Sequence, residues 1–184
     1  MKKIYILLMH TYTIPSRLVR VFTNYEYSHV GISLDKKCDT IYSFGRKKLN
    51  SILNGGFVVE KKDGLFFKKF NNTKCKIYEL EVTKKQYKDL ENILKDMEQD
   101  NEKYKYDFLG IVPRFFKIPV TLKNRYVCSY FVAYVLEKAN ICNFTKNVCL
   151  INPRDFEKLE GTIEIYSGFL RMYWGIYGKE NSFI

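Results

Sequence analysis

The stretch Tyr27-Ser28-His29-Val30-Gly31-Ile32-Ser33-Leu34 alternates between larger apolar side chains and small or polar ones. A two-residue period predicts a β-strand whose valine, isoleucine and leucine face the core. His29 falls on the opposite side of that strand, beside a glycine and a serine, and therefore off the main core face. Residues 35–39 are polar and turn-forming, and residues 40–44 predict a second strand. We therefore expect an antiparallel hairpin that begins near His29.

Further strands are expected on both sides of this hairpin. Residues 3–9 are rich in β-forming side chains and contain the continuous apolar run Ile4–Met9, which predicts a buried strand. Residues 57–60 and 76–82 are rich in β-forming side chains and predict two more strands. Gly45 and residues 54–56 are expected to mark turns between them.

The helices follow the strands along the chain. Thr83-Lys84-Lys85-Gln86 matches a capping box, and apolar residues then recur at helical spacing to about residue 100. A largely apolar helix is expected over residues 128–138, a short one over residues 14–22, and another helix start at residues 152–155.

Residues 104–116, with the breakers Gly110 and Pro113, are expected to be irregular. This order of elements predicts an α+β fold, in which helices pack on an antiparallel sheet. The absence of repeats and linkers predicts a single domain over residues 1–184.

The composition suits a domain with reduced cysteines. The chain has 184 residues, of which 46% are hydrophobic, so a sizeable core can form. Its five cysteines include no C-x-x-C pair, and only two histidines are present, so neither disulfides nor a zinc site is expected. No P-loop, dinucleotide-binding, zincin or serine-elbow motif occurs. We therefore expect no cofactor and no metal.

The net charge of +11 favours anionic partners such as nucleic acid, anionic lipid head groups or cell-wall polymers. The lysines are scattered, however, and no helix-turn-helix, RNP or finger motif is present, so specific nucleic-acid binding is not expected. The apolar run Ile4–Met9 superficially resembles a signal peptide, but it ends at His10 without a small-residue cleavage site. We expect a cytoplasmic protein.

Cys128 is the first candidate for chemistry, because it falls at the first turn of an expected helix. The free amides and partial positive charge at a helix N-terminus stabilise a thiolate, so they predict a lowered pKa for Cys128. The amides of Cys128 and Ser129 can also stabilise an oxyanion. The alternative is that Cys128 is a small buried core residue.

A nucleophilic thiol needs an imidazole base within reach, and the chain offers only two. His29 is preferred because it lies off the main core face. His10 ends the first strand and is expected to line the same cleft.

The order and spacing of these segments resemble the permuted NlpC/P60 papain-like superfamily. The similarity rests mainly on Tyr27-Ser28-His29-Val30 and Tyr126-Val127-Cys128-Ser129, with the histidine strand before the cysteine helix. The superfamily includes bacterial YiiX-like proteins and lecithin:retinol acyltransferase-like enzymes. The resemblance implies a papain-like fold, with Cys128 as nucleophile at a helix N-terminus and His29 as base.

The resemblance also implies a third polar group on the next strand, and the expected hairpin brings Ser43 to that position. Where relatives often carry His, Glu or Asn, this chain has a serine, so Glu60 and Asp107 remain alternatives. Tyr104 and Tyr106 are expected to flank the substrate cleft, although aromatic residues in such a context more often serve in packing.

These features predict a cysteine hydrolase, either an amidase or peptidase or an acyl-ester hydrolase, that works through an acyl-thioester. Its substrate would be a small molecule, peptide or lipid carrying an amide or ester. The alternatives are a lipid acyltransferase, a non-catalytic basic binding module of the same fold, and a nucleic-acid-binding protein. The apolar residues 111–119, with basic residues among them, are expected to cap the cleft, to touch a lipid surface or to form a buried connector.

Overall fold

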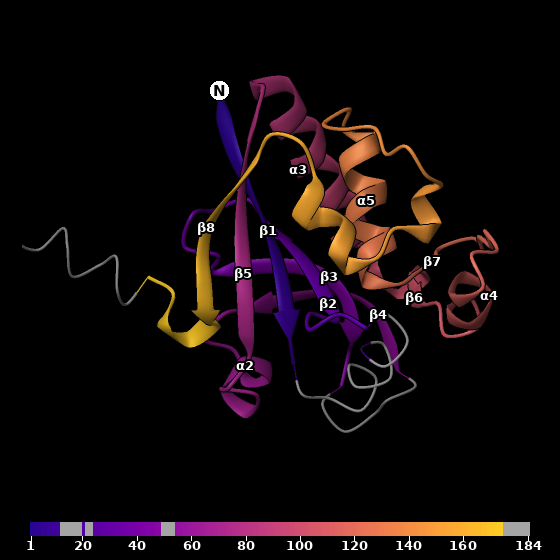
Figure 1. Cartoon of the computed structure of the whole chain (residues 1–184), viewed down its shortest axis with the longest axis horizontal. Helices are drawn as coiled ribbons and strands as arrows, with labels where there is room; N and C mark the ends of the chain where they lie inside the picture. The colour runs from indigo at the N-terminus through magenta and orange to yellow at the C-terminus, as the bar shows by residue number, and fades with distance from the viewer. Residues whose placement is uncertain (12–19, 21–23, 49–53, 175–184) are drawn as a thin grey trace, which may run out of the picture.

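The chain is described by a computed structural model that places residues 1–11, 20, 24–48 and 54–174. The short helix expected over residues 14–22 lies outside these residues, apart from Arg20. The fold is mixed α+β, with one curled sheet and few helices (Figure 1).

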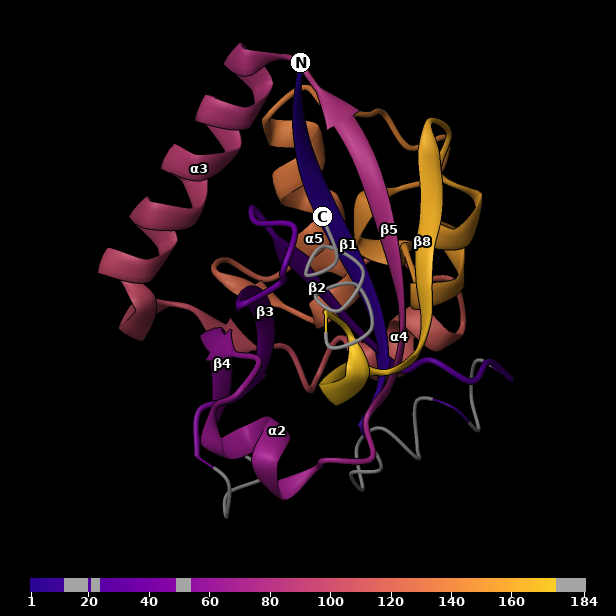
Figure 2. The same cartoon turned by 90° about the vertical axis from the view of Figure 1, so that its left-hand side faces the viewer.

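The sheet contains eight strands in the described part of the chain, in the order β7-β6-β4-β3-β2-β1-β5-β8. The β6–β7 pair is parallel and the other neighbouring pairs are antiparallel. Figure 2 shows β1, β5 and β8 running side by side. The strands are β1 (Lys2–His10), β2 (His29–Ser33), β3 (Thr40–Arg46), β4 (Gly55–Lys61), β5 (Lys74–Val82), β6 (Lys105–Tyr106), β7 (Arg125–Tyr126) and β8 (Thr162–Phe169).

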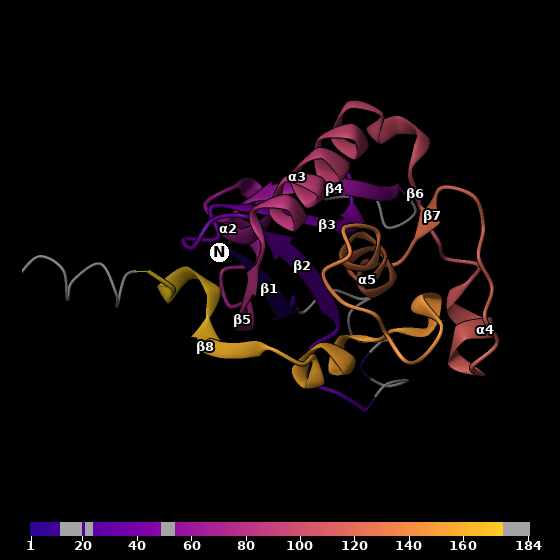
Figure 3. The same ribbon diagram turned by 90° about the horizontal axis from the view of Figure 1, so that it is seen from above.

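Four α-helices accompany the sheet in the described residues, and 3-10 turns fill several of the connections. The helix α5 lies on the concave side of the sheet, whereas α4 lies at the margin of the molecule (Figure 3). The helices are α2 (Leu65–Lys69), α3 (Lys84–Gln99), α4 (Ile111–Phe115) and α5 (Cys128–Lys138); the 3-10 turns are η1 (Asn101–Lys103), η2 (Val148–Leu150), η3 (Pro153–Lys158) and η4 (Leu170–Met172).

Both faces of the central strands are buried. Ile4, Ile6 and Leu8 of β1 join a large core that includes α3 and α5. The alternate residues Leu7 and Met9 join a second, smaller core on the opposite face. This explains why β1 is apolar at nearly every position, which is typical of a strand covered on two sides.

The hairpin of β2 and β3 agrees with the alternation seen in the sequence. Val30 and Ile32 are fully buried in the larger core, as expected. The face that carries His29 was expected to be off the core, but the second core covers part of it. A Cβ on Gly31 would lie only 2.5 Å from the Ile41 side chain of that second core. A glycine is therefore required in the middle of β2.

The expectation that Gly45 and residues 54–56 mark turns is wrong, because these glycines lie within β3 and β4. A Cβ on Gly56 would lie 2.4 Å from the carbonyl oxygen of Tyr104. A Cβ on Gly55 would lie 2.8 Å from the Tyr106 side chain. The glycines therefore allow the β6 segment to approach β4 closely, which is a tertiary requirement and not a turn signal.

The two main helices are where the sequence predicts them. The Thr83 hydroxyl accepts the Gln86 amide at 3.2 Å, and the Gln86 side chain accepts the Thr83 amide at 2.9 Å, so the capping box is complete at the start of α3. The helix start expected at residues 152–155 is the 3-10 turn η3. Residues 104–116 are more regular than expected, because they contain β6 and α4. The sequence did not predict α2 or β8.

Candidate active site

Cys128 is the first residue of α5 and is 5% exposed. Its sulfur lies 4.0 Å from the carbonyl oxygen of Ser28, to which the thiol can donate. The backbone amides of Val30, of Ser129 and of Cys128 itself lie within hydrogen-bonding range of the sulfur. The sulfur therefore sits where the amino end of α5 meets the start of β2.

This environment does not lower the pKa of Cys128. Burial raises the pKa of the thiol, and the amides of Val30, Ser129 and Cys128 oppose that effect without overcoming it. The sequence-based expectation of a depressed pKa considered only the helix terminus, and it is wrong for the closed site. In this state the Cys128 side chain is a protonated thiol at neutral pH.

His29 is held by a short hydrogen-bonded chain. Its Nε2 lies 3.1 Å from the Ser43 hydroxyl oxygen, and that hydroxyl lies 2.6 Å from the carbonyl oxygen of Val30. A carbonyl only accepts, so the single Ser43 proton points to Val30. Ser43 must then accept from Nε2–H, which assigns the proton of the neutral ring to Nε2 and leaves Nδ1 as the basic nitrogen.

The imidazole is neutral at physiological pH. Burial, together with the positive charge of Arg46, lowers the pKa of His29 to about 4. The Arg46 guanidinium is held over two aromatic rings of the α2 region, 6.0 Å from the Phe66 centroid and 5.5 Å from the Phe70 centroid. Arg46 is a charged neighbour of His29 that the sequence-based interpretation missed.

Glu60 shares this environment on the second face of the sheet. Burial, partly opposed by the charge of Arg46, raises the pKa of Glu60 to about 7. Among the residues that the structure places, neither Glu60 Oε2 nor Arg46 Nη2 has a hydrogen-bond partner, and both atoms are buried. Since Arg46 influences both His29 and Glu60, the three side chains form one electrostatic group.

The three candidates for the third polar group differ in how they relate to His29. Ser43 is within hydrogen-bonding distance of His29, as the hairpin register Gly31↔Ser43 dictates. Asp107 is fully buried, but its carboxylate accepts from the Gly110 amide at 3.0 Å and from Arg114 at 2.6 Å. Its oxygens are therefore engaged elsewhere. Glu60 is linked to His29 only through the charge of Arg46.

Cys128 lies beside the end of β2 that begins with His29. The sulfur contacts the backbone of Ser28 and Val30, the two residues that flank His29. The Ser43 hydroxyl that binds the imidazole also binds the Val30 carbonyl. A strand from early in the chain and a helix from late in the chain thus place the Cys128 thiol beside the backbone on either side of His29, while the imidazole itself is bound by Ser43.

Tyr106, one of the four residues expected to contact substrate, is a neighbour of Cys128. Its pKa is raised by burial and by the neighbouring Cys128. Tyr104 lies elsewhere, in a cavity of about 370 Å³ that it shares with Met97, Asn124 and Tyr134. Its ring packs 6.4 Å from that of Tyr126, which indicates a packing role.

The other two expected contacts are engaged in the structure. Ser129 is buried, and its hydroxyl donates to the Ile151 carbonyl at 2.7 Å, so only its amide faces the sulfur. His10 is buried at the end of β1, and its Nε2 lies 2.8 Å from the Arg20 guanidinium. Burial and Arg20 lower the pKa of His10.

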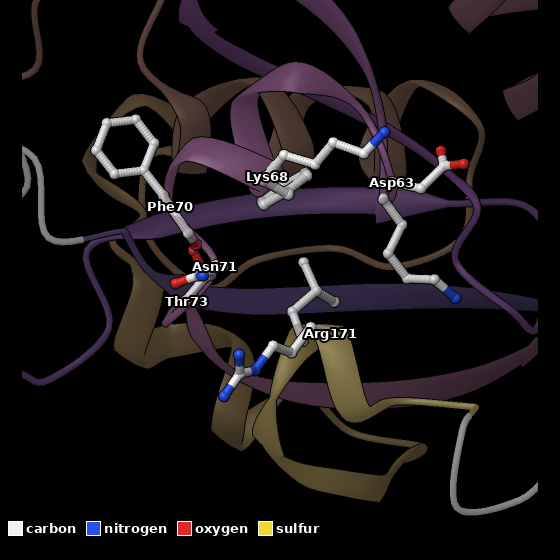
Figure 4. Close-up of a pocket in the computed structure, with 9 residues that line it drawn as sticks. Asp63, Lys68, Phe70, Asn71, Thr73 and Arg171 are labelled. Atoms are coloured by element: carbon white, nitrogen blue, oxygen red, sulfur yellow. The ribbon is translucent and has the colours of Figure 1, made fainter.

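A second cavity, of about 270 Å³, lies over the smaller core and contains neither Cys128 nor His29. Its apolar floor includes Phe67 and Leu170. Lys68 and Arg171 stand on opposite rims, and Asp63 lies near Lys68 (Figure 4). Thr73 is the buried polar residue among those labelled in Figure 4, and its hydroxyl already donates to the Phe70 carbonyl. We therefore do not take this cavity as the candidate active site.

No protein-family model and no curated protein matches this sequence. Within the described residues, no three His, Cys, Asp or Glu side chains gather in a way that would hold a metal ion. None of the helices in that part of the chain combines the length and the apolar character needed to cross a bilayer.

Proposed function

We propose that this chain is a cysteine hydrolase of the permuted NlpC/P60, papain-like type, with Cys128 as nucleophile and His29 as base. The observation that carries the proposal is the convergence of the Cys128 sulfur and the His29–Ser43 pair on the backbone of Val30. The strand with the histidine precedes the helix with the cysteine, which is the order of the permuted superfamily.

The chemistry follows from the protonation states. As the thiol sulfur attacks a substrate carbonyl, its proton passes to Nδ1 of His29, so the S–C bond forms while the imidazole becomes cationic. The electron pair of the C=O bond moves to oxygen, where the amides of Cys128 and Ser129 are suited to stabilise it. The imidazolium then protonates the leaving amine or alcohol, and a thioester remains.

Hydrolysis closes the cycle. His29 takes a proton from water, the hydroxyl attacks the thioester carbonyl, and the S–C bond breaks. The sulfur recovers the proton from His29, which restores the thiol and releases a carboxylic acid. Because Cys128 is 5% exposed, the residues above it must move aside before an acyl group can reach the sulfur.

Acylation by an activated ester tests the proposal without knowledge of the natural substrate. With p-nitrophenyl acetate, we expect a burst of one p-nitrophenol per chain and an acetyl group on the Cys128 peptide by mass mapping. C128S should abolish the burst. C142S is the matched control, since Cys142 is the most exposed cysteine of the described residues. Equal acetylation of several cysteines, without a burst, would contradict the proposal.

A second candidate is a binding module of the same fold without catalysis. It is favoured by one observation: Cys128 is buried and protonated in this state. The two candidates differ in what Cys128→Ser does, because a binding module should keep its ligand affinity whereas an acylating enzyme loses its intermediate.

A further inference from the structure

An apolar projection interrupts the chain between β6 and β7. We call residues 108–122, which contain α4, the apolar knob. More than half of the large hydrophobic side chains that are exposed in the described residues belong to it. A group of this size on a folded surface indicates an interaction site, whereas isolated exposed apolar residues do not. The knob exposes Leu109 (73%), Val112 (63%), Phe115 (49%), Phe116 (66%), Ile118 (53%) and Leu122 (39%).

A buried ion pair and its hydrogen bonds hold the knob in a defined conformation. Arg114 Nη2 lies 2.6 Å from an oxygen of Asp107, at side-chain exposures of 8% and 0%. The same nitrogen donates to the Val120 carbonyl at 2.9 Å, and Asp107 accepts the Gly110 amide at 3.0 Å. The Arg114 guanidinium also lies 5.5 Å from the Tyr130 ring centroid. This buried pair anchors the loop, so its apolar side chains are held outward.

The exposed charges along the knob segment itself are of one sign. No Asp or Glu occurs between Asp107 and Glu137. Asp107 neutralises Arg114, and Lys117 and Lys123 remain as exposed cations beside the apolar side chains. Apolar residues that enter an acyl layer, with lysines at head-group level, are the pattern of an interfacial anchor on an anionic membrane.

The net charge of the chain favours an anionic membrane over a second copy of the chain as the partner of the knob. The chain carries +11, so a second copy would bring a like-charged surface to the knob. An anionic bilayer offers both the apolar interior that the exposed side chains need and the negative charge that the lysines need. The knob also lies at the outer margin of the molecule, where a flat surface can reach it (Figures 1 and 3).

We propose that the apolar knob docks this protein on the surface of anionic lipid bilayers. The knob lies in the connection from β6, which contains Tyr106, a neighbour of Cys128, to β7, and only Val127 separates β7 from Cys128. If the proposed hydrolase function holds, docking brings the site to membrane-borne substrates, namely lipid or lipid-linked amides and esters. The docking itself does not depend on that function.

The test is co-sedimentation of the full chain with vesicles. We expect the chain to bind vesicles of phosphatidylcholine in which about one lipid in three is phosphatidylglycerol. Binding to pure phosphatidylcholine should be much weaker, and binding to the anionic vesicles should be lost at high salt. V112S/F116S should weaken binding by about tenfold or more. L65S/I163S is the matched control, because Leu65 (76%) and Ile163 (63%) are equally exposed but lie outside the knob. The control should bind like the wild type.

A second readout does not depend on loss of binding. Leu109→Trp should show a blue-shifted emission when anionic vesicles are added, whereas Leu65→Trp should not. Absence of binding to the anionic vesicles, or equal weakening in V112S/F116S and L65S/I163S, would overturn the proposal. So would a dimer in sedimentation equilibrium that V112S/F116S dissociates, if vesicles are not bound. Repeating the assay with C128S separates the two proposals, since docking must persist when acylation is abolished.

Discussion

Ser43 is the residue whose chemistry says most about the candidate site. Its single proton is committed to the Val30 carbonyl, so it can only accept from His29. A serine in this position orients the ring and fixes its tautomer, but it cannot offset the charge of an imidazolium as a carboxylate would. The neutral resting state of His29 is consistent with such a partner.

Replacing Ser43 by Ala should therefore slow acylation of Cys128 moderately. We expect a loss on the order of tenfold, below the ~100-fold or greater loss that removal of a general base causes. The burst rate with p-nitrophenyl acetate measures the acylation rate. A melting curve shows whether the variant stays folded when the buried Val30 carbonyl loses its hydrogen-bond donor. An unchanged burst rate would show that Ser43 does not orient the ring.

Glu60 makes a separate contribution that depends on pH. Its folded-state pKa is raised to about 7, so its stabilising contribution is present below its unfolded pKa of 4.5 and is lost as the pH rises through 7. His29 acts in the opposite sense, because its folded-state pKa is lowered and its contribution is lost as the pH falls from 6.5 towards 4. Between about pH 4.5 and 6.5 the two effects oppose each other.

Glu60→Gln should remove one of these opposing effects. Relative to the wild type, the variant should gain free energy of unfolding between pH 5 and pH 8, by up to about 3 kcal/mol. Urea denaturation at several pH values measures this difference. A difference between variant and wild type that is constant over this range would show that Glu60 does not titrate with a raised pKa.

Among the elements, α3 was predictable because its signal is local. The capping box of Thr83 and Gln86 requires only four consecutive residues, and the structure contains both hydrogen bonds. In contrast, Gly55 and Gly56 are required by the β6 segment, which comes much later in the chain. No local pattern reveals such a requirement, so the sequence predicted turns there. The strand β8 has half-buried or exposed residues on both faces and lacks the alternation that identified β2.

The candidate site also combines features that local sequence predicts with features that only tertiary contacts determine. The positions of Cys128 and His29 within their elements follow from local sequence, and the register of the hairpin brings Ser43 to His29. The influence of Arg46 on both His29 and Glu60 depends on how the end of β3 packs against α2, which local sequence does not determine. The closed state of the thiol also depends on tertiary burial and not on the helix start alone.

Loss of the capping box tests the best-predicted element. Thr83→Ala should lower the free energy of unfolding by about 1 kcal/mol, since the Gln86 amide loses its acceptor. Thr83→Ser keeps the hydroxyl and should remain within a few tenths of a kcal/mol of the wild type. Urea denaturation distinguishes the two variants, and an equal loss in both would show that the cap does not stabilise α3.

At the scale of the whole molecule, the sheet separates two cores. Phe131 belongs to the larger core, between α5 and the sheet, and Phe67 of α2 belongs to the smaller one. Cys128 belongs to α5, on the side of the larger core, whereas His29 shares its face of the sheet with Gly31 and Ser43. The candidate site therefore draws residues from both sides of the sheet.

The separation of the cores predicts additive effects. Phe131→Leu and Phe67→Leu should each cost about 1–2 kcal/mol of unfolding free energy, and the double variant should lose the sum to within about 0.5 kcal/mol. A double-mutant cycle by urea denaturation measures the coupling. A coupling well above that value would show that the two cores do not act independently.

The central claim is that His29 activates Cys128, and the burst rate of Cys128 acylation as a function of pH tests it most directly. The wild type should acylate at a rate that is constant from about pH 5 to pH 8, because the imidazole is already neutral throughout that range. His29→Asn should acylate on the order of 100-fold more slowly at pH 7. A His29→Asn burst rate within about threefold of the wild type would contradict the claim.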